Sequence, residues 1–106
     1  MEEKLEQASV VLDGLPSGTV AAVTADAARG DGISAEQTLR AIVIQRMTGW
    51  GYGDLAFRVQ GSAMLRRFCR LGPGDAFSEA MLEQAIQRIT LPTMERVTRH
   101  LVAHGL

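Results

Sequence analysis

Apolar residues recur every three or four positions along most of the chain, the spacing that places them on one face of an α-helix. Leu5, Ala8 and Leu12 follow this spacing near the start, and Val97 and Leu101 follow it near the end. No segment alternates apolar and polar residues over more than a few positions, so we expect no strands. The pattern predicts an all-α fold, a compact bundle of about six or seven short helices.

Glycine, proline and serine residues divide the chain into these helices. Ser34 is the strongest start signal, because Gln37 follows it three residues later in the spacing of a capping box. Pro92 suits the first turn of a last helix, because the N–H that proline lacks is not needed there. The predicted helices span Glu2–Asp13, Thr19–Arg29, the residues between Ser34 and Gly49, Tyr52–Val59, Ala63–Leu71, Ser78–Ile89 and the residues from Pro92 onward.

Each predicted helix carries apolar residues that we expect to face a shared core. For the second helix these are Val20, Val23 and Ala27, and for the last helix they are Met94, Val97, Leu101 and Val102. Short helices joined by glycine-containing turns are also the parts of helix-turn-helix units. Two predicted pairs have this form, one joined by residues 60–62 and the other by residues 72–77.

The size and composition of the chain are those of one globular domain. At 106 residues and 46% hydrophobic content it is long enough to bury a core. Cys69 is the only cysteine, so we expect no disulfide within the chain. The first thirty residues lack a basic start followed by an apolar run, and no apolar stretch approaches the length of a membrane span. These features predict a cytoplasmic protein with no membrane partner.

Charge is distributed unevenly along the chain, although the net charge is only −1. Residues 1–39 carry two basic and seven acidic side chains, whereas residues 40–106 carry nine arginines and five acidic side chains. Arginine makes forked contacts with phosphate and with guanine. The arginine-rich part therefore indicates either a nucleic-acid contact or ordinary solvated helix faces, and composition alone does not separate the two.

Two patterns that resemble ligand sites are better explained by structure. Gly49, Gly51 and Gly53 follow a helix rather than a strand and lack the lysine of a phosphate-binding loop, so we interpret them as a helix-ending turn. His100 and His104 share a helix face, but no third ligand stands in register with them. We expect no metal and no cofactor.

Two further groups of reactive side chains lack the partners that catalysis needs. Cys69 has no paired histidine to activate it, and its neighbours Phe68 and Leu71 indicate a packed, inert position. Glu79 and Glu83 lie one helical turn apart, which is typical of a solvated helix face. The sequence predicts no catalytic residues and no enzyme activity.

Seven arginines form the predicted DNA contact. Arg66, Arg67 and Arg70 rank first, because they lie together on the fifth predicted helix. If such side chains converge, they hold several phosphates with an affinity that falls as salt rises. The supporting candidates are Arg40, Arg46, Arg58 and Arg88.

An ordered series of motifs runs through the middle of the chain. Leu39-Arg-Ala-Ile-Val43 is followed by Gly51-Tyr-Gly-Asp-Leu-Ala56, then by Phe68-Cys-Arg-Leu-Gly72 and by the helix from Leu82 to Ile89. This series resembles the N-terminal domain of bacterial insertion-sequence DDE transposases of the ISNCY-like group. The resemblance divides a single domain of residues 1–106 into an acidic lead-in (1–33), a transposase-like part (34–91) and a C-terminal helix (92–106).

The resemblance implies an all-helical domain that recognises the inverted repeats at transposon ends and takes part in subunit assembly. In that family a ribonuclease-H-like domain follows and carries the metal-binding Asp, Asp and Glu. None of the 106 residues matches that domain, so we expect no strand transfer by this chain. One departure lies in the helix from Ser78 to Ile89, where Glu79 and Glu83 replace basic or polar residues of the family and are unfavourable beside phosphate.

Two functions of different classes follow from these observations. The first is a transposase-derived DNA-binding domain, without the catalytic domain, that recognises double-stranded DNA at transposon ends. The alternative is a protein-interaction module, a transposase remnant that forms a homodimer or regulates the full-length transposase. The apolar faces of the last two helices and the acidic sixth helix favour the alternative. A small enzyme or metal protein that uses His100 and His104 ranks below both.

Overall fold

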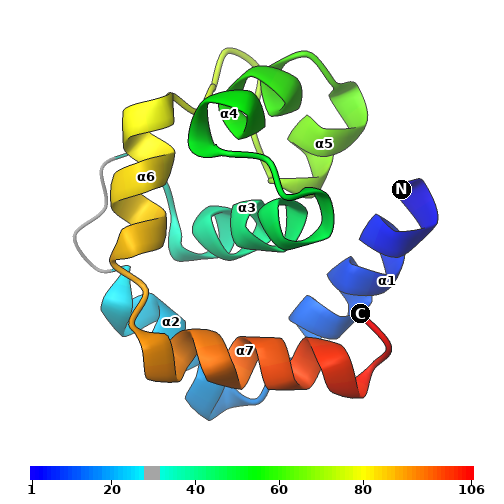
Figure 1. The fold of residues 1–106 in the computed structure, drawn as a ribbon, viewed down its shortest axis with the longest axis vertical. Helices are drawn as coiled ribbons and strands as arrows, with labels where there is room; N and C mark the ends of the chain where they lie inside the picture. The colour runs from blue at the N-terminus through cyan, green and yellow to red at the C-terminus, as the bar shows by residue number, and fades with distance from the viewer. Residues whose placement is uncertain (28–31) are drawn as a thin grey trace.

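The computed structural model describes residues 1–27 and 32–106, which form seven α-helices and no strand (Figure 1). The predicted all-α fold is therefore confirmed. The helices are α1 (Glu2–Asp13), α2 (Ser17–Asp26), α3 (Ala35–Thr48), α4 (Tyr52–Gln60), α5 (Ala63–Phe68), α6 (Glu79–Gln87) and α7 (Leu91–Ala103).

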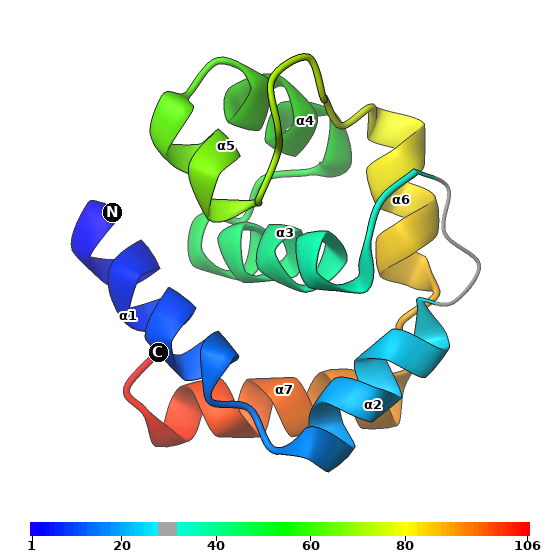
Figure 2. The ribbon, with the colours of Figure 1, turned by 180° about the vertical axis from the view of Figure 1, so that it is seen from behind.

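Helix α3 lies at the centre of the molecule. Figures 1 and 2 show α4, α5 and α6 on one side of it and α1, α2 and α7 on the other. All seven residues from Thr38 to Ile44 are buried. The sequence pattern predicts a single apolar stripe on this helix, but packing on both sides requires a helix that is buried almost all round.

One hydrophobic core extends through both groups of helices and includes the acidic lead-in. Leu5, Ala8 and Leu12 of α1 are buried in it together with Val97 and Leu101 of α7. The core therefore depends on residues from both ends of the chain, and Figure 1 shows the C-terminus beside α1.

Two residues predicted to face the core are exposed instead. Val20 is 46% exposed and Val102 is 64% exposed. On α7 the buried residues Thr93, Val97 and Leu101 recur every four positions, so the core contacts a narrow stripe. Val102 lies beside that stripe, on the outer face of the helix, which explains why its prediction was wrong.

Most helix ends follow the predicted signals. Ser34 and Gln37 form both hydrogen bonds of the capping box, each 3.0 Å long. Gly49 ends α3 in the left-handed conformation, with φ of 76°, which glycine adopts without a steric penalty. The predicted end of the second helix at Arg29 lies outside the described residues, and α5 ends at Phe68, three residues earlier than predicted.

Helices α4 and α5 form the first of the two predicted helix-turn-helix-like pairs. They are joined by Gly61 and Ser62 and pack against each other. The Ser62 hydroxyl accepts a 3.2 Å hydrogen bond from the Leu65 N–H and so caps α5. After the loop of residues 69–78, α6 packs on α4 and α3.

No single helix in the described parts of the chain is long and apolar enough to cross a membrane. Among the residues that the structure describes, one bent pair of helices, α1 and α2, reaches that length and composition, with an angle of 99° between the two.

Candidate nucleic-acid interface

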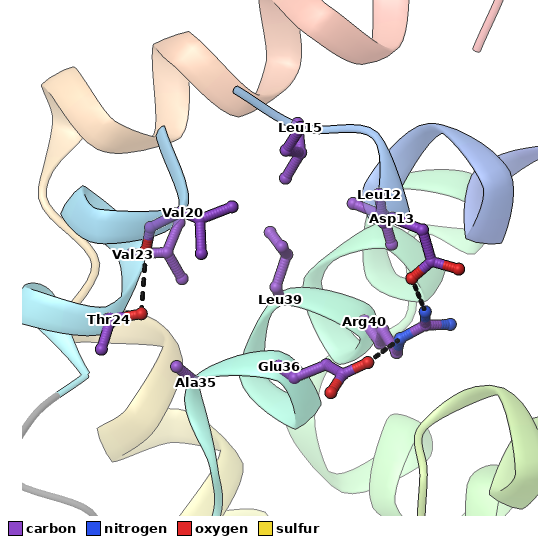
Figure 3. A pocket seen from close by; sticks show the side chains of 10 residues that line it. All are labelled: Leu12, Asp13, Leu15, Val20, Val23, Thr24, Ala35, Glu36, Leu39 and Arg40. Carbon is purple, nitrogen blue, oxygen red and sulfur yellow. Dashed lines mark hydrogen bonds and ion pairs between the residues drawn. The ribbon is translucent and has the colours of Figure 1, made fainter. Parts of the chain in front are cut away.

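Arg40 is buried inside the molecule, with only 2% of its surface exposed. Its guanidinium lies 3.2 Å from the Asp13 carboxylate and 3.3 Å from the Glu36 carboxylate (Figure 3). It also donates hydrogen bonds to the Ser9 hydroxyl and to the Phe68 carbonyl, at 3.1 and 3.2 Å. The prediction that Arg40 contacts phosphate is therefore wrong, because Ser9 and Asp13 of the acidic lead-in, together with Glu36 and Phe68, engage all three nitrogens of its guanidinium within the fold.

The cleft shown in Figure 3 lies beside this arginine, between α1, α2 and α3. Its volume is about 280 Å³, and leucine and valine make up half of the ten residues that line it. Its polar side chains already have partners: Arg40 binds Asp13 and Glu36, and the Thr24 hydroxyl donates to the Val20 carbonyl at 2.8 Å. The four polar side chains that line this cleft are therefore engaged within the fold.

Arg66 is half-buried and holds the loop that follows α5. Its guanidinium donates to the Gly72 carbonyl at 3.0 Å and to the Asp75 carbonyl at 2.7 Å. The Asp75 carboxylate in turn accepts from the Gly72 N–H at 3.2 Å. Arg66 thus has a structural use that competes with phosphate binding.

Arg70 forms the turn that ends α5. Its backbone lies in the left-handed region, with φ of 59°, and the Leu71 N–H donates back to the Arg66 carbonyl at 3.0 Å. The Arg70 guanidinium lies 3.1 Å from the Glu36 carboxylate and 3.9 Å from that of Asp13. Arg40 and Arg70 therefore share one pair of carboxylates, which neutralises the positive charge at this point.

The remaining candidates on α4, α5 and α6 lie apart from one another. Arg67 is exposed and has no partner among the described residues, but it borders a hollow with Glu2 and Glu6. The exposed Arg58 stacks over the Trp50 ring, 5.0 Å from its centroid. Arg88 is half-buried at the C-terminal end of α6. The structure does not bring the seven predicted arginines into one patch.

The acidic residues of α6 have a structural explanation. A Cβ added at Gly53 would lie 3.3 Å from Oε2 of Glu79, so this carboxylate lies against the first turn of α4. Negative charge is favourable beside a helix N-terminus. Glu83 is exposed further along the same helix. The two carboxylates give α6 negative charge, and the expectation that this helix disfavours phosphate stays a prediction.

A different set of cations lies together along α7. Arg46, at the end of α3, borders one hollow with Lys4 of α1 and a second hollow with Arg99 of α7. Arg99 borders a third hollow with Arg96. All four side chains are exposed and have no ion pair with any described residue. This α7 basic face, defined as Lys4, Arg46, Arg96 and Arg99, is the strongest candidate for contact with an anionic polymer.

Only Arg46 of this basic face is among the arginines that the sequence pattern singles out. Arg96 and Arg99 lie in the C-terminal helix, outside the motifs that resemble transposases. Their three-residue spacing places them on one helix face, and Thr93, Val97 and Leu101 occupy the opposite, buried face. That spacing was available in the sequence, whereas the proximity of Lys4 and Arg46 depends on the tertiary fold.

Of the other reactive side chains, Cys69 is packed in the core, whereas His100 is half-buried and His104 is exposed. Cys69 is fully buried, and burial raises the pKa of its thiol to about 12, although the nearby Arg40 charge acts in the opposite direction. A thiol of this kind stays protonated and is a poor nucleophile. The His100 and His104 rings lie 4.7 Å apart, and the described residues contain no group of three or more His, Cys, Asp or Glu able to hold a metal ion.

No protein-family model, curated protein or solved structure matches this chain. The resemblance to transposase N-terminal domains therefore stays a prediction, and the functional argument depends on the surface described above.

Proposed function

We propose that this chain is a DNA-binding domain that holds a duplex by its phosphate backbone on the α7 basic face. The observation that carries the proposal is the contrast between two groups of arginines. Arg40, Arg66 and Arg70 are engaged by carboxylates and carbonyls of the fold, whereas Arg46, Arg96 and Arg99 have no such partners among the described residues. Cations left unpaired on one surface favour an anionic partner from outside the chain.

The shape of this face also supports contact with a polymer. Its hollows lie next to one another along α7 and share Arg46 and Arg99 as common borders. A row of cations suits the regular spacing of phosphates better than it suits one small ligand. Phosphate contacts supply affinity but little sequence discrimination, so the proposed preference for transposon ends depends on the resemblance of residues 34–91. Such a role would place the domain in the bacterial cytoplasm.

Fluorescence anisotropy of labelled duplexes tests this proposal. The parent protein is titrated with a transposon inverted repeat and with a shuffled duplex at several salt concentrations. Four phosphate contacts predict a slope of about −3.6 in log K against log salt. The double variant Arg46→Gln with Arg99→Gln removes two contacts, so its slope is expected to fall to roughly half.

The matched control is Arg67→Gln with Arg70→Gln, which removes the same charge from α5 and the turn that follows it. We expect this variant to bind DNA as the parent does, because Arg70 is paired and Arg67 lies on another face. If the control variant lost DNA binding and the variant at Arg46 and Arg99 did not, the DNA contact would lie at α5 rather than on the α7 basic face. Equal binding of both duplexes would leave backbone contact but remove the transposon-end preference.

A second candidate function, self-association, is favoured by the outer face of α7. Leu91 is 70% exposed and Val102 is 64% exposed on this helix. An antiparallel pair of α7 helices would bring Leu91 of one copy against Val102 of the other. The same pairing would place Glu95 of one copy near Arg99 of the other, so the face is complementary to itself.

Sedimentation velocity over a range of concentrations tests self-association. A dimer formed through α7 is expected to dissociate in the variant Leu91→Ser with Val102→Ser. The matched control is Phe57→Ser, because Phe57 on α4 is 78% exposed and lies outside this face. A parent that sediments as a monomer at every concentration would exclude this function and leave α7 free for DNA.

A further inference from the structure

One face of α1 carries a row of polar side chains. Glu2, Glu6, Ser9 and Asp13 follow one another at intervals of three or four residues, so they lie on the same face of the helix. Four apolar residues of α1 are buried in the core, and they fix the direction of this polar face. Figures 1 and 2 show the N-terminal part of α1 near α5, and the two helices are in contact.

The polar face of α1 meets two arginines across a hollow of about 260 Å³. Glu2 and Glu6 border this hollow from α1, and Arg67 and Arg70 border it from α5 and the turn after it. Further along the same face of α1, the Asp13 carboxylate lies 3.9 Å from the Arg70 guanidinium. Three carboxylates of one helix, the α1 acidic row of Glu2, Glu6 and Asp13, therefore lie beside Arg67 and Arg70.

The other charges around this hollow do not restore a basic surface. Glu36 of α3 adds a fourth carboxylate, 3.1 Å from the Arg70 guanidinium. Arg40 adds a third guanidinium, but it is buried and already held by Asp13 and Glu36. The four carboxylates outnumber the three guanidinium groups, so this surface has no net positive charge that would attract phosphate.

The stability of the fold does not explain the charges of Glu2 and Glu6. Both side chains are exposed, and neither forms a hydrogen bond or an ion pair with a described residue. Exposed charges of this kind contribute little to folding even when they are paired. Their effect on an external anion is larger, because like charges brought together at an interface suppress binding.

We infer that the α1 acidic row is an autoinhibitory contact, which takes the place of a phosphate backbone beside Arg67 and Arg70 and keeps DNA away from α5. The inference rests on the proposed DNA binding, and it adds a second, covered contact surface to the α7 basic face. Neutralising the row uncovers Arg67 and Arg70 as two further phosphate contacts.

Fluorescence anisotropy of a labelled duplex at several salt concentrations tests the inference. The variant Glu2→Gln with Glu6→Gln and Asp13→Asn removes the charge of the row and keeps the size of each side chain. With two contacts added to the four of the α7 basic face, its slope of log K against log salt is expected to steepen from about −3.6 to about −5.4.

The charge control is Glu3→Gln with Asp54→Asn and Glu83→Gln, which removes three exposed carboxylates that do not border the hollow. It has the same net charge as the variant of the acidic row, and we expect it to keep the slope of the parent. A slope in the row variant no steeper than in this control would overturn the inference.

Removal of the two arginines shows whether they carry the gain. Arg67→Gln with Arg70→Gln is expected to leave the parent unchanged, because the row already covers both arginines. In the variant that lacks the row, the same two substitutions are expected to return the slope to about −3.6. A gain in binding that survives the loss of both arginines would contradict the autoinhibitory contact.

Asp13 also holds Arg40, so circular dichroism of each variant checks that the fold is kept. If Asp13→Asn unfolds the chain, Glu2→Gln with Glu6→Gln leaves the partners of Arg40 in place. This double variant is expected to uncover Arg67 alone and to give a slope of about −4.5. An unchanged slope in the folded double variant would overturn the inference.

The same titrations separate this inference from the proposed function. Binding by the parent through Arg46 and Arg99, with no gain when the row is neutralised, would leave the α7 basic face and remove the autoinhibitory contact. Binding only after neutralisation, and only with Arg67 and Arg70 present, would keep the autoinhibitory contact and place the DNA site on α5. Absence of duplex binding in every variant would overturn both.

Discussion

At the residue scale, Arg40 is expected to stabilise the fold through both its hydrogen bonds and its volume. It is the largest fully buried side chain and joins α1, α3 and α5. Arg40→Ala leaves a cavity and an unsatisfied Phe68 carbonyl, so we expect a loss of about 3 kcal/mol in the free energy of unfolding. Urea denaturation followed by circular dichroism measures it.

Arg40→Met separates the two contributions of this side chain. Methionine keeps most of the volume, and the exposed Asp13 and Glu36 carboxylates stay hydrated without their partner. We therefore expect a loss of only about 1 kcal/mol, close to that of one buried hydrogen bond. The control Arg67→Ala is expected to change stability by less than about 0.5 kcal/mol. Equal losses in the alanine and methionine variants would show that charge pairing dominates.

Arg70 leads to a prediction of the opposite sign. Its backbone has a positive φ of 59°, which is unfavourable for any residue with a side chain, and its guanidinium is 52% exposed beside Glu36. An exposed ion pair contributes about 0–1 kcal/mol, similar to the backbone penalty. Arg70→Gly is therefore expected to be neutral or stabilising by up to about 1 kcal/mol, whereas Arg70→Ala destabilises. The midpoints of thermal unfolding of both variants, compared with that of the parent, test this prediction. A strongly destabilised Arg70→Gly variant would contradict it.

The contacts of individual side chains were the least predictable feature of this molecule. The sequence indicates that arginines dominate residues 40–106, but their uses depend on partners that are distant along the chain. Arg40 meets Asp13 across 27 positions, and no local pattern contains that contact. By contrast, the burial of Cys69 was predictable, because it follows Phe68 within an amphipathic segment.

At the element scale, the capping box of α3 is expected to stabilise the central helix. The Ser34 hydroxyl accepts from the Gln37 N–H, and the Gln37 side chain accepts from the Ser34 N–H. Ser34→Ala removes the first bond and is expected to lower the free energy of unfolding by about 1 kcal/mol. The control is Ser17→Ala at the start of α2, where the serine side chain makes no capping bond. Equal effects in chemical denaturation would argue against a specific capping contribution.

Helix ends were predicted well where the signal lies in the local sequence, and poorly where tertiary contacts determine the end of the helix or the burial of its face. Ser34, Gly49 and Pro92 act through their own backbone geometry, so their elements begin and end close to the expected positions. The end of α5 differs, because Arg70 takes a conformation usually reserved for glycine. The exposure of Val102 was also not predictable from the sequence. Periodicity identifies the apolar face of a helix, but it does not show how much of that face the core covers.

At the scale of the whole molecule, the uneven charge along the sequence does not become an equally polarised surface. Asp13 and Glu36, from the acidic part, fold onto Arg40 and Arg70 and cancel them. Among the described residues, the α7 basic face gathers cations without ion pairs from three helices, α1, α3 and α7. Linear clustering of arginines therefore singles out residues 66–70, whereas the tertiary arrangement of α7 beside α3 and α1 groups Lys4, Arg46, Arg96 and Arg99.

The acid stability of the molecule is expected to depend on the contact between α2 and α7. The Asp26 carboxylate accepts from the Thr90 N–H at 2.9 Å and from the Thr90 hydroxyl at 3.0 Å, where α7 begins. The backbone hydrogen bond from Thr90, with smaller contributions from the Thr93 and Thr90 side chains, lowers the pKa of Asp26 below its ordinary 3.8. A carboxyl whose pKa is lower in the folded state stabilises the fold above its unfolded pKa, and this contribution is lost as the pH falls through the folded pKa.

Asp26→Asn is therefore expected to be less stable than the parent at pH 7, and the difference should shrink as the pH falls below about 4. Urea denaturation at a series of pH values between 7 and 2.5 measures the difference. Glu83→Gln removes an exposed carboxylate from α6 and is expected to leave the pH dependence of the parent unchanged. A stability difference between Asp26→Asn and the parent that stays constant across this range would mean that the Asp26 charge does not join α2 to α7. The contribution of Asp26 to the α2–α7 contact would then be independent of its ionisation.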